Sequence, residues 1–251
     1  MHIQYTDLPE PKSLPEGATL EYATQDQDCR SLERFALRTL NAGMRTPEII
    51  DESRESFWII ISGKGTMTRG DETTQIRPRD LIITPPGVPH SLAAGDTPIK
   101  WFDVAFHSST WGIAAEALEN GIGDPHDDHI QGKPSLVRGE ELPPQEGDSC
   151  YRYPHARPHS TLDHWDQNSS EPGARAANHV HDSHEEFWYI HEGSGHVEQN
   201  GQIFEVSAGD LIGHAPGVHH TLIAEKEPIR WYCFCMNRWL MPFVKDALVE
   251  A

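Results

Sequence analysis

The segment 179–193, His-Val-His-Asp-Ser-His-Glu-Glu-Phe-Trp-Tyr-Ile-His-Glu-Gly, decides how the rest of the chain is interpreted. His179 and His181 are one residue apart, so they lie on the same face of an extended strand, because strand side chains alternate with period two. Glu186 begins an aromatic and β-branched run that is typical of a strand. The segment therefore places two imidazoles and a carboxylate on neighbouring extended stretches of chain.

A second segment, 209–220, supplies a third histidine. It reads Gly-Asp-Leu-Ile-Gly-His-Ala-Pro-Gly-Val-His-His, which predicts a short strand, a Pro-Gly turn and a histidine that enters the next strand. Three imidazoles and one carboxylate on facing strands form a site for a divalent transition metal. We therefore expect one such ion to be bound by four side chains: His179, His181, Glu186 and His220.

These two segments resemble the two sequence motifs of the cupin superfamily. The resemblance includes glycines as well as metal ligands, at the family's spacings: Gly173, His179, His181, Glu186 and Gly193 in the first motif, and Gly217 and His220 in the second. Two positions depart from the second motif. Ala215 stands where the family usually has proline, and Ala224 stands where it often has asparagine. Neither position is a metal ligand in the family.

The N-terminal half repeats the C-terminal half at a constant offset of 130 residues, as between Phe57 and Phe187. The same offset relates Trp58 to Trp188, Gly63 to Gly193, Asp80 to Asp210, Gly87 to Gly217, His90 to His220 and Trp101 to Trp231. A repeat of this kind indicates two copies of one domain. Short strands at regular spacing, separated by Gly and Pro turns, predict an antiparallel barrel or jelly roll for each copy.

The resemblance and the repeat together imply an all-β fold of tandem double-stranded β-helix (jelly-roll) cupin barrels, a bicupin. We expect residues 1–119 to form an N-terminal cupin barrel, 120–147 a linker, and 148–251 a C-terminal barrel with the metal site and a C-terminal helix. Apolar residues at helical spacing predict a short flanking helix over 111–118, and we expect a matching helix over 239–249.

The two copies differ at the predicted metal ligands. At the offset of 130, the N-terminal counterparts of His179, His181, Glu186 and His220 are Ile49, Asp51, Ser56 and His90. Asp51 and His90 alone do not make the donor set that a transition metal needs. We therefore expect a degenerate N-terminal site without metal, one divalent ion per chain, and an N-terminal barrel that covers sheet edges of the other.

Other residues near the predicted site admit two interpretations each. Trp188 shares the strand face of Glu186, so it either lines the substrate pocket or packs in the barrel core. His214 precedes the Pro-Gly turn and is either a pocket residue, acting as a base or supporting the ligands, or a surface histidine. His184 alternates away from the ligands and is expected to be solvated, and His164 lies in a segment that is expected to be irregular. The catalytic base is unknown from the sequence.

Composition excludes several classes of function. The 251 residues include 39 acidic and 20 basic side chains, a formal net charge of −19. This charge argues against binding of nucleic acid or of anionic membranes, and no apolar run approaches the roughly 20 residues that span a bilayer. The proline-rich residues 1–16, expected to be irregular, lack the basic region and apolar run of a signal peptide. We therefore expect a cytoplasmic protein.

Four scattered cysteines fit that compartment, and free thiols are expected. Cys233 and Cys235 share one strand face and are expected to pack as small hydrophobic residues. A thiolate metal site there would need two further soft ligands, which the sequence does not reveal.

The donor set leaves two adjacent positions of an octahedral metal open. With Fe(II) such a site supports activation of O₂, whereas Mn, Zn or Ni would act as a Lewis acid. We favour Fe(II) and a non-haem dioxygenase that acts on a small oxygenated substrate. The alternatives are a Mn-, Zn- or Ni-dependent isomerase or lyase of a small carbonyl or carboxylate compound, and a non-catalytic small-ligand-binding cupin. The superfamily hosts all three, and the resemblance also implies a homodimer.

Overall fold

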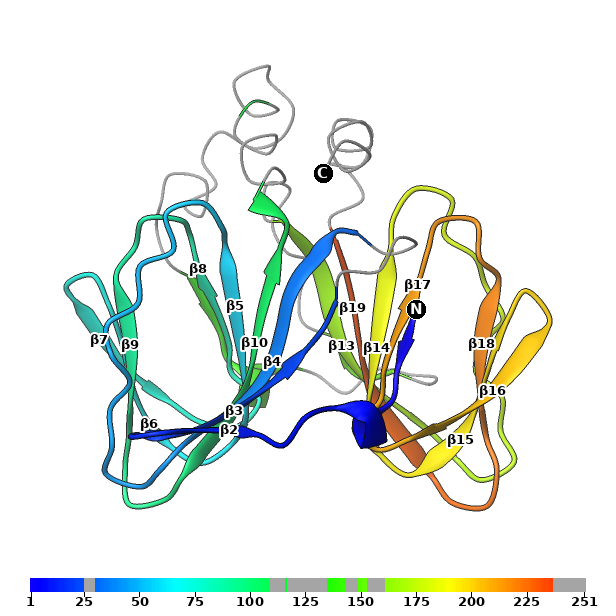
Figure 1. Cartoon of the computed structure of the whole chain (residues 1–251), viewed down its shortest axis with the longest axis horizontal. Coiled ribbons are helices and arrows are strands. Elements are labelled where there is room, and N and C mark those ends of the chain that lie inside the picture. Colours follow the sequence, from blue (N-terminus) through cyan, green and yellow to red (C-terminus); the bar gives the residue numbers. More distant parts are fainter. Residues whose placement is uncertain (25–29, 109–115, 117–134, 143–148, 153–160, 237–251) are drawn as a thin grey trace.

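The computed structural model describes residues 1–24, 30–108, 116, 135–142, 149–152 and 161–236. These residues form two β-barrels that lie side by side (Figure 1), and the predicted all-β architecture of tandem jelly-roll barrels is confirmed. The flanking helices predicted over 111–118 and 239–249 fall outside the described residues, apart from Glu116. In the part of the chain that is described, no helix is long and apolar enough to cross a membrane.

The N-terminal barrel consists of a seven-stranded antiparallel sheet in the order β11-β8-β5-β10-β4-β3-β2 and a three-stranded sheet in the order β7-β6-β9. The strand bounds are β2 (Lys12–Leu14), β3 (Gly17–Tyr22), β4 (Leu32–Leu40), β5 (Ser56–Ser62), β6 (Gly65–Arg69), β7 (Glu72–Ile76), β8 (Leu81–Thr84), β9 (His90–Ala94), β10 (Ile99–Phe106) and β11 (Ser135–Val137).

The C-terminal barrel repeats this arrangement with a six-stranded sheet, β1-β17-β14-β19-β13-β12, and a three-stranded sheet, β16-β15-β18. Its strands are β1 (His2–Ile3), β12 (Ser149–Arg152), β13 (Leu162–Ser170), β14 (Glu186–Glu192), β15 (Ser194–Gln199), β16 (Gln202–Ser207), β17 (Leu211–His214), β18 (His220–Ala224) and β19 (Ile229–Met236). Five strands, β4, β5, β8, β9 and β10, match β13, β14, β17, β18 and β19 at an offset of 130, so the predicted repeat is a structural one.

Alternation along the strands divides each large sheet into two faces. In β14, Trp188 and Ile190 point into the barrel interior, whereas Phe187 and Tyr189 belong to a second core that is shared with the N-terminal barrel. The rings of this shared core pack closely, and Phe35 stacks on Phe234 with centroids 5.6 Å apart. Burying such large aromatic side chains stabilises the contact, so the two barrels share one continuous apolar layer.

The motif glycines are required by the turns between strands. Gly193 has a φ of +84°, a conformation that side-chain-bearing residues rarely adopt. A Cβ atom there would lie 2.2 Å from the carbonyl oxygen of Pro228. The repeat preserves the same constraint at Gly63, which has a φ of +86°. These glycines therefore set the spacing between the strands that carry the site.

Two buried glutamates join the barrels reciprocally. Glu55 of the N-terminal barrel accepts hydrogen bonds from the backbone N–H and the hydroxyl of Thr161, both at 2.7 Å. Its counterpart, Glu185, accepts from the N–H groups of Arg30 and Ser31, both at 2.8 Å, and from the Ser31 hydroxyl. Each carboxylate thus fixes the residues that lie just before a long strand of the opposite barrel, Thr161 before β13 and Arg30 and Ser31 before β4.

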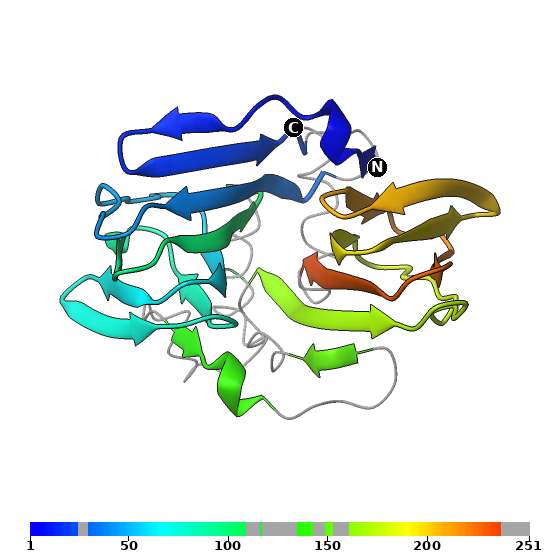
Figure 2. The same ribbon diagram turned by 90° about the horizontal axis from the view of Figure 1, so that it is seen from below.

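Two short arms also cross between the barrels, on opposite edges of the molecule (Figure 2). β1 adds to the edge of the C-terminal sheet at β17, and β11 adds to the edge of the N-terminal sheet at β8. The expectation that residues 1–16 are irregular is wrong, because they contain β1, β2 and a 3₁₀ turn. The range 120–147, which was expected to act as a linker, likewise contains β11. The reason is long-range pairing, which leaves no local pattern in strands this short.

An aspartate anchors each arm. Asp210 accepts hydrogen bonds from the Tyr5 N–H at 2.8 Å and from the His2 ring at 3.2 Å, and Asp80 accepts from the Arg138 guanidinium at 2.7 Å. Burial acts to raise the pKa of Asp210, but hydrogen bonds from His2 and from the N–H groups of Tyr5 and Ser207 outweigh it and hold the pKa below its ordinary value.

We predict that Glu55→Ala destabilises the protein by about 2 kcal/mol, because the buried Thr161 donors lose their charged acceptor. For a chain of this length the melting temperature should fall by about 4–8 °C. Glu192→Ala is the control, since Glu192 pairs with Arg230 on the surface, and such pairs contribute less than about 1 kcal/mol. Thermal unfolding of the metal-free proteins measures both. Equal melting temperatures for the two variants would contradict a joining role for Glu55.

We also predict a pH signature for the first arm. Because the pKa of Asp210 is depressed in the folded state, its stabilisation is present above the ordinary carboxyl pKa of about 3.9 and is lost as the pH falls through the folded value. Asp210→Asn should therefore be less stable than wild type at pH 7, and the difference should shrink in acid. Urea unfolding at pH 7 and in acid tests this prediction. The exposed substitution Asp71→Asn is the control. A difference that does not change with pH would refute the assignment.

Candidate metal centre

The four predicted ligands converge on one point of the C-terminal barrel. Glu186 is the first residue of β14 and His220 is the first residue of β18. His179 forms an isolated β-bridge with His220, in which each backbone N–H donates to the other's carbonyl, at 3.1 and 2.9 Å. His181 is held by its carbonyl, which accepts from the Gly217 N–H at 2.8 Å. Backbone pairing of the two motifs therefore assembles the site.

The donor atoms are close to one another. Oε2 of Glu186 lies 3.2 Å from Nε2 of His179, 2.8 Å from Nε2 of His181 and 2.8 Å from Nε2 of His220. Nε2 of His179 and Nε2 of His220 are 3.1 Å apart. All four donor atoms lie within 4.8 Å of one another.

The surroundings fix how these donors point. Nδ1 of His179 is bonded to the Ala177 carbonyl at 2.9 Å, and Nδ1 of His220 to the Val218 carbonyl at 2.8 Å. The carbonyls accept the ring N–H, so Nε2 carries the lone pair that faces the centre. Oε1 of Glu186 accepts from the Trp188 indole at 2.8 Å, which leaves Oε2 for the three imidazoles.

The electrostatics match the geometry. Burial acts to raise the pKa of Glu186, but when the Nε2 atoms carry protons, hydrogen bonds from His179, His181 and His220 outweigh it and hold the pKa well below its ordinary value. A bound ion would take the place of those protons. The pKa of His179 is raised by its hydrogen bond to Glu186. Donors about 2.1 Å from a common ion and at right angles would lie about 3.0 Å apart, close to the separations between these donors. The donor set therefore fits a divalent transition metal.

A cavity of about 400 Å³ opens above this centre. That volume suits a small molecule. Besides three of the converging side chains, its wall contains polar and aromatic residues from β13, β14 and β19: His164, Asp166, Asn168, Trp188, Trp231 and Cys233.

The two pocket candidates lie in different places. Trp188 lines the cavity and holds Glu186 by its indole N–H. His214 is not among the lining residues; it is 1 % exposed and stacks on the ring of His220, with centroids 4.0 Å apart. The surface interpretation of His214 is therefore wrong, and so is the solvated interpretation of His184, which is also buried. Burial lowers the pKa of His214 well below its ordinary value.

Sequence reasoning missed the contribution of β13 to the cavity. His164 was placed in an irregular segment, but it lies on this strand beside Asp166 and Asn168, which share its face. The offset of 130 could have identified the strand, because it relates 162–170 to the N-terminal strand Leu32–Leu40.

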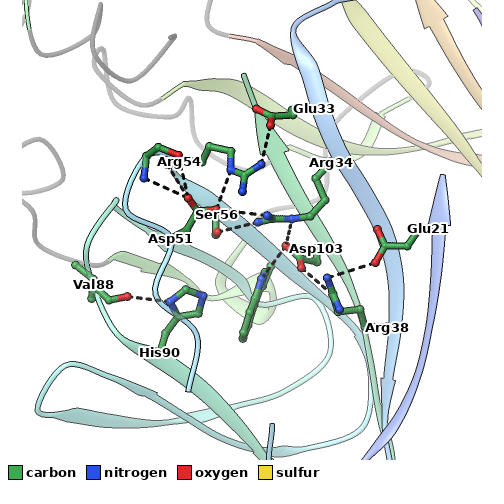
Figure 3. A network of polar contacts seen from close by, with 12 residues as sticks. Glu21, Glu33, Arg34, Arg38, Asp51, Arg54, Ser56, Val88, His90 and Asp103 are labelled. Atoms are coloured by element: carbon green, nitrogen blue, oxygen red, sulfur yellow. Dashed lines mark hydrogen bonds and ion pairs between the residues drawn. The ribbon is translucent and has the colours of Figure 1, made fainter. Parts of the chain in front are cut away.

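The N-terminal counterpart of the centre contains a built-in cation (Figure 3). The Arg34 guanidinium lies 3.4 Å from Asp51, 3.1 Å from the Ser56 hydroxyl and 3.0 Å from Asp103. Burial acts to raise the pKa of Asp51, but Ser53, Arg54 and Arg34 hold it below its ordinary value. Among the residues that the structure describes, the clusters of three or more His, Cys, Asp or Glu donors lie in the C-terminal barrel.

His90 keeps part of the geometry of its counterpart His220. Its Nδ1 bonds to the Val88 carbonyl at 2.9 Å, as that of His220 does to Val218. Burial lowers the pKa of His90 below its ordinary value. In this copy, a positive charge is supplied by the Arg34 guanidinium. The corresponding part of the C-terminal barrel contains the candidate metal ligands.

Residues 36–105 and 169–235 each match the cupin domain family. Among solved structures, oxalate decarboxylase of Lactobacillus farciminis in its formate complex is similar, with 17% identity and a TM-score of 0.72 over 94% of this chain and 86% of that chain. A mutant of Bacillus subtilis oxalate decarboxylase has 18% identity and a TM-score of 0.73 over 94% and 77%. No curated protein matches the chain. At these identities the structural likeness concerns the fold.

We predict that His181→Ala and Glu186→Ala each reduce bound manganese from about one ion per chain to a small fraction, because each removes a donor from the shared site. His90→Ala is the matched control in the other copy and should retain full occupancy. Elemental analysis after loading with Mn(II) and desalting measures the content, and circular dichroism checks folding. Loss of manganese from His90→Ala would contradict the assignment of the N-terminal site as degenerate.

Proposed function

The chain belongs to the cupin family, and we propose that it is a divalent-metal enzyme that acts as a lyase or isomerase on a small carbonyl or carboxylate compound. The observation that carries this proposal is the convergence of three imidazoles and one carboxylate at the base of a cavity of about 400 Å³. The proposed ligands are His179, His181, Glu186 and His220. A bound divalent ion would supply Lewis acidity, which polarises a carbonyl and acidifies the neighbouring proton.

The chain's own residues have separate roles in this proposal. Trp188 keeps Oε1 of Glu186 occupied by its indole N–H, so one carboxylate oxygen faces the centre. Trp188 and Trp231 form an apolar wall that limits access of water. Glu186 is engaged with the imidazoles and is not available as a base. Asp166, on the cavity wall and 2 % exposed, is our candidate for moving a proton to or from the substrate.

The charge of the cavity restricts the substrate. Its described wall contains Asp166 and no lysine or arginine. A dianion bound there would place its second charge near the Asp166 carboxylate, with no lysine or arginine in that wall to compensate it, which costs free energy. A neutral or singly charged compound, such as a hydroxy- or keto-monocarboxylate, fits better than a small dicarboxylate.

The comparisons favour the lyase alternative over the dioxygenase that the sequence first suggested. The two structurally similar bicupins named above are oxalate decarboxylases, which favours the lyase alternative. Manganese, zinc or nickel is therefore preferred as the cofactor, and a small molecule remains the expected partner. The cytoplasmic location and the homodimer remain predictions.

We predict turnover without oxygen. The chain loaded with Mn(II), Zn(II) or Ni(II) should convert a member of a panel of hydroxy- and keto-monocarboxylates under anaerobic conditions, as followed by NMR. Glu186→Gln should abolish turnover through loss of metal. Asp166→Asn should lower kcat by about 10²-fold or more while its metal content stays full. His90→Ala should behave as wild type.

Three outcomes would contradict this proposal. Turnover that requires both Fe(II) and O₂ would establish the dioxygenase instead. A preference for oxalate over the monocarboxylates would overturn the charge argument. Thermal stabilisation by a compound that is never converted would indicate a binding protein, since a ligand of the native state stabilises by mass action.

A further inference from the structure

A second group of donors lies beside the metal centre. His164, Cys233 and Cys235 bring one nitrogen and two sulfur atoms within 4.8 Å of one another. Both cysteines are free thiols and both are buried. The expectation that they pack only as small hydrophobic residues is therefore incomplete, because an imidazole faces both sulfurs.

Strand register builds this group. In the six-stranded sheet, His164 of β13 pairs with Cys235 of β19, and Cys235 pairs in turn with Glu186 of β14. Cys233 is two residues from Cys235 and so shares its face. One row across three strands thus places the sulfur group directly beside the carboxylate of the first centre. The thiol of Cys233 donates to Oε1 of Glu186 at 2.6 Å.

The separations fit a tetrahedral ion. Nε2 of His164 lies 3.4 Å from Sγ of Cys235 and 3.8 Å from Sγ of Cys233. Donors about 2.1 Å and 2.3 Å from zinc at the corners of a tetrahedron lie about 3.6 Å apart. The two sulfurs and the nitrogen would occupy three corners and leave the fourth for another donor.

The histidine is oriented as a metal ligand is. Nδ1 of His164 bonds to the carboxylate of Asp163 at 2.9 Å. Ligating histidines commonly donate their second ring N–H to a carboxylate, which turns the lone pair of the other nitrogen toward the ion. Asp163 therefore directs Nε2 of His164 to the two sulfurs.

The N-terminal copy contains a cation at the corresponding place. At the offset of 130, Arg34 replaces His164 and Asp103 replaces Cys233, and the guanidinium contacts this carboxylate at 3.0 Å. Arg34 thus neutralises an anionic side chain there. In the C-terminal copy, two ionisable thiols occupy this part of the barrel, and the imidazole of His164 takes the place of the arginine.

We propose that His164, Cys233 and Cys235 form a second metal site, selective for a thiophilic ion such as Zn(II), next to the His/Glu centre. The ion binds both sulfurs as thiolates, any remaining thiol proton is released to solvent, and no redox change is involved. Two metals of different preference would then share one barrel: an oxygen- and nitrogen-preferring ion at Glu186 and a sulfur-preferring ion beside it. This inference adds a site and does not depend on the proposed reaction.

Cobalt tests the proposal because Co(II) bound to thiolate absorbs in the near ultraviolet by sulfur-to-metal charge transfer. The full chain, reduced and stripped of metal, is titrated with Co(II). We expect this absorption in the wild type and in His179→Ala/His181→Ala, which lacks two donors of the first centre. The absorption should disappear in Cys233→Ser/Cys235→Ser and persist in Cys150→Ser, a control that removes a cysteine and leaves all three proposed donors in place.

Zinc analysis and a milder variant complete the test. Zinc content should fall from about two ions per chain to about one in Cys233→Ser/Cys235→Ser. Asp163→Asn leaves all three donors in place and should weaken cobalt binding at this site about 10- to 100-fold. This variant tests the proposal if the double cysteine variant does not fold. Absence of the charge-transfer band from the folded, reduced wild type overturns the proposal, as does a band that survives the double cysteine variant.

Discussion

The burial of one carboxylate constrains the C-terminal barrel more than any other interaction. Glu186 is 3 % exposed, and an ionised carboxylate in such a place is costly unless it is paired and hydrogen-bonded. Three imidazoles, an indole and a thiol surround its two oxygens. Those groups come from both motifs and from β19, so the pairing of the strands and the stabilisation of this charge depend on each other.

The two copies resolve the same electrostatic problem with different chemistry. In the N-terminal barrel, the Arg34 guanidinium lies between Asp51 and Asp103, and Arg54 and Arg38 also pair with these carboxylates. These permanent cations are covalently part of the chain, so they balance the charge of both carboxylates without an exchangeable ion. In the C-terminal barrel, three imidazoles stand in place of such a cation and can hold a bound ion instead. One copy can therefore serve as a rigid scaffold while the other carries exchangeable chemistry.

Much of this could be predicted from the sequence, for physical reasons. Strand alternation predicted that His179 and His181 lie on one face. The offset of 130 allows the strand positions in one copy to be predicted from those in the other. Long-range effects were not accessible. The two- and three-residue strands of the arms form only by pairing with a distant edge, and His214 is buried because His220 stacks on it. The charge balance at Arg34 also depends on groups that are far apart in the sequence.

The exchanged arms have a consequence for how such a molecule is assembled. Each arm precedes the strands of one barrel in the sequence but covers the outer edge of the sheet in the other, at β17 and β8, and so removes an unpaired strand edge that could recruit another chain. The same exchange of arms occurs between subunits in an arm-swapped dimer, but here both halves belong to one polypeptide. In separate subunits, that exchange would weaken on dilution. Covalent connection makes it intramolecular and independent of protein concentration. It also lets the two halves diverge, because a change in one is no longer copied into the other.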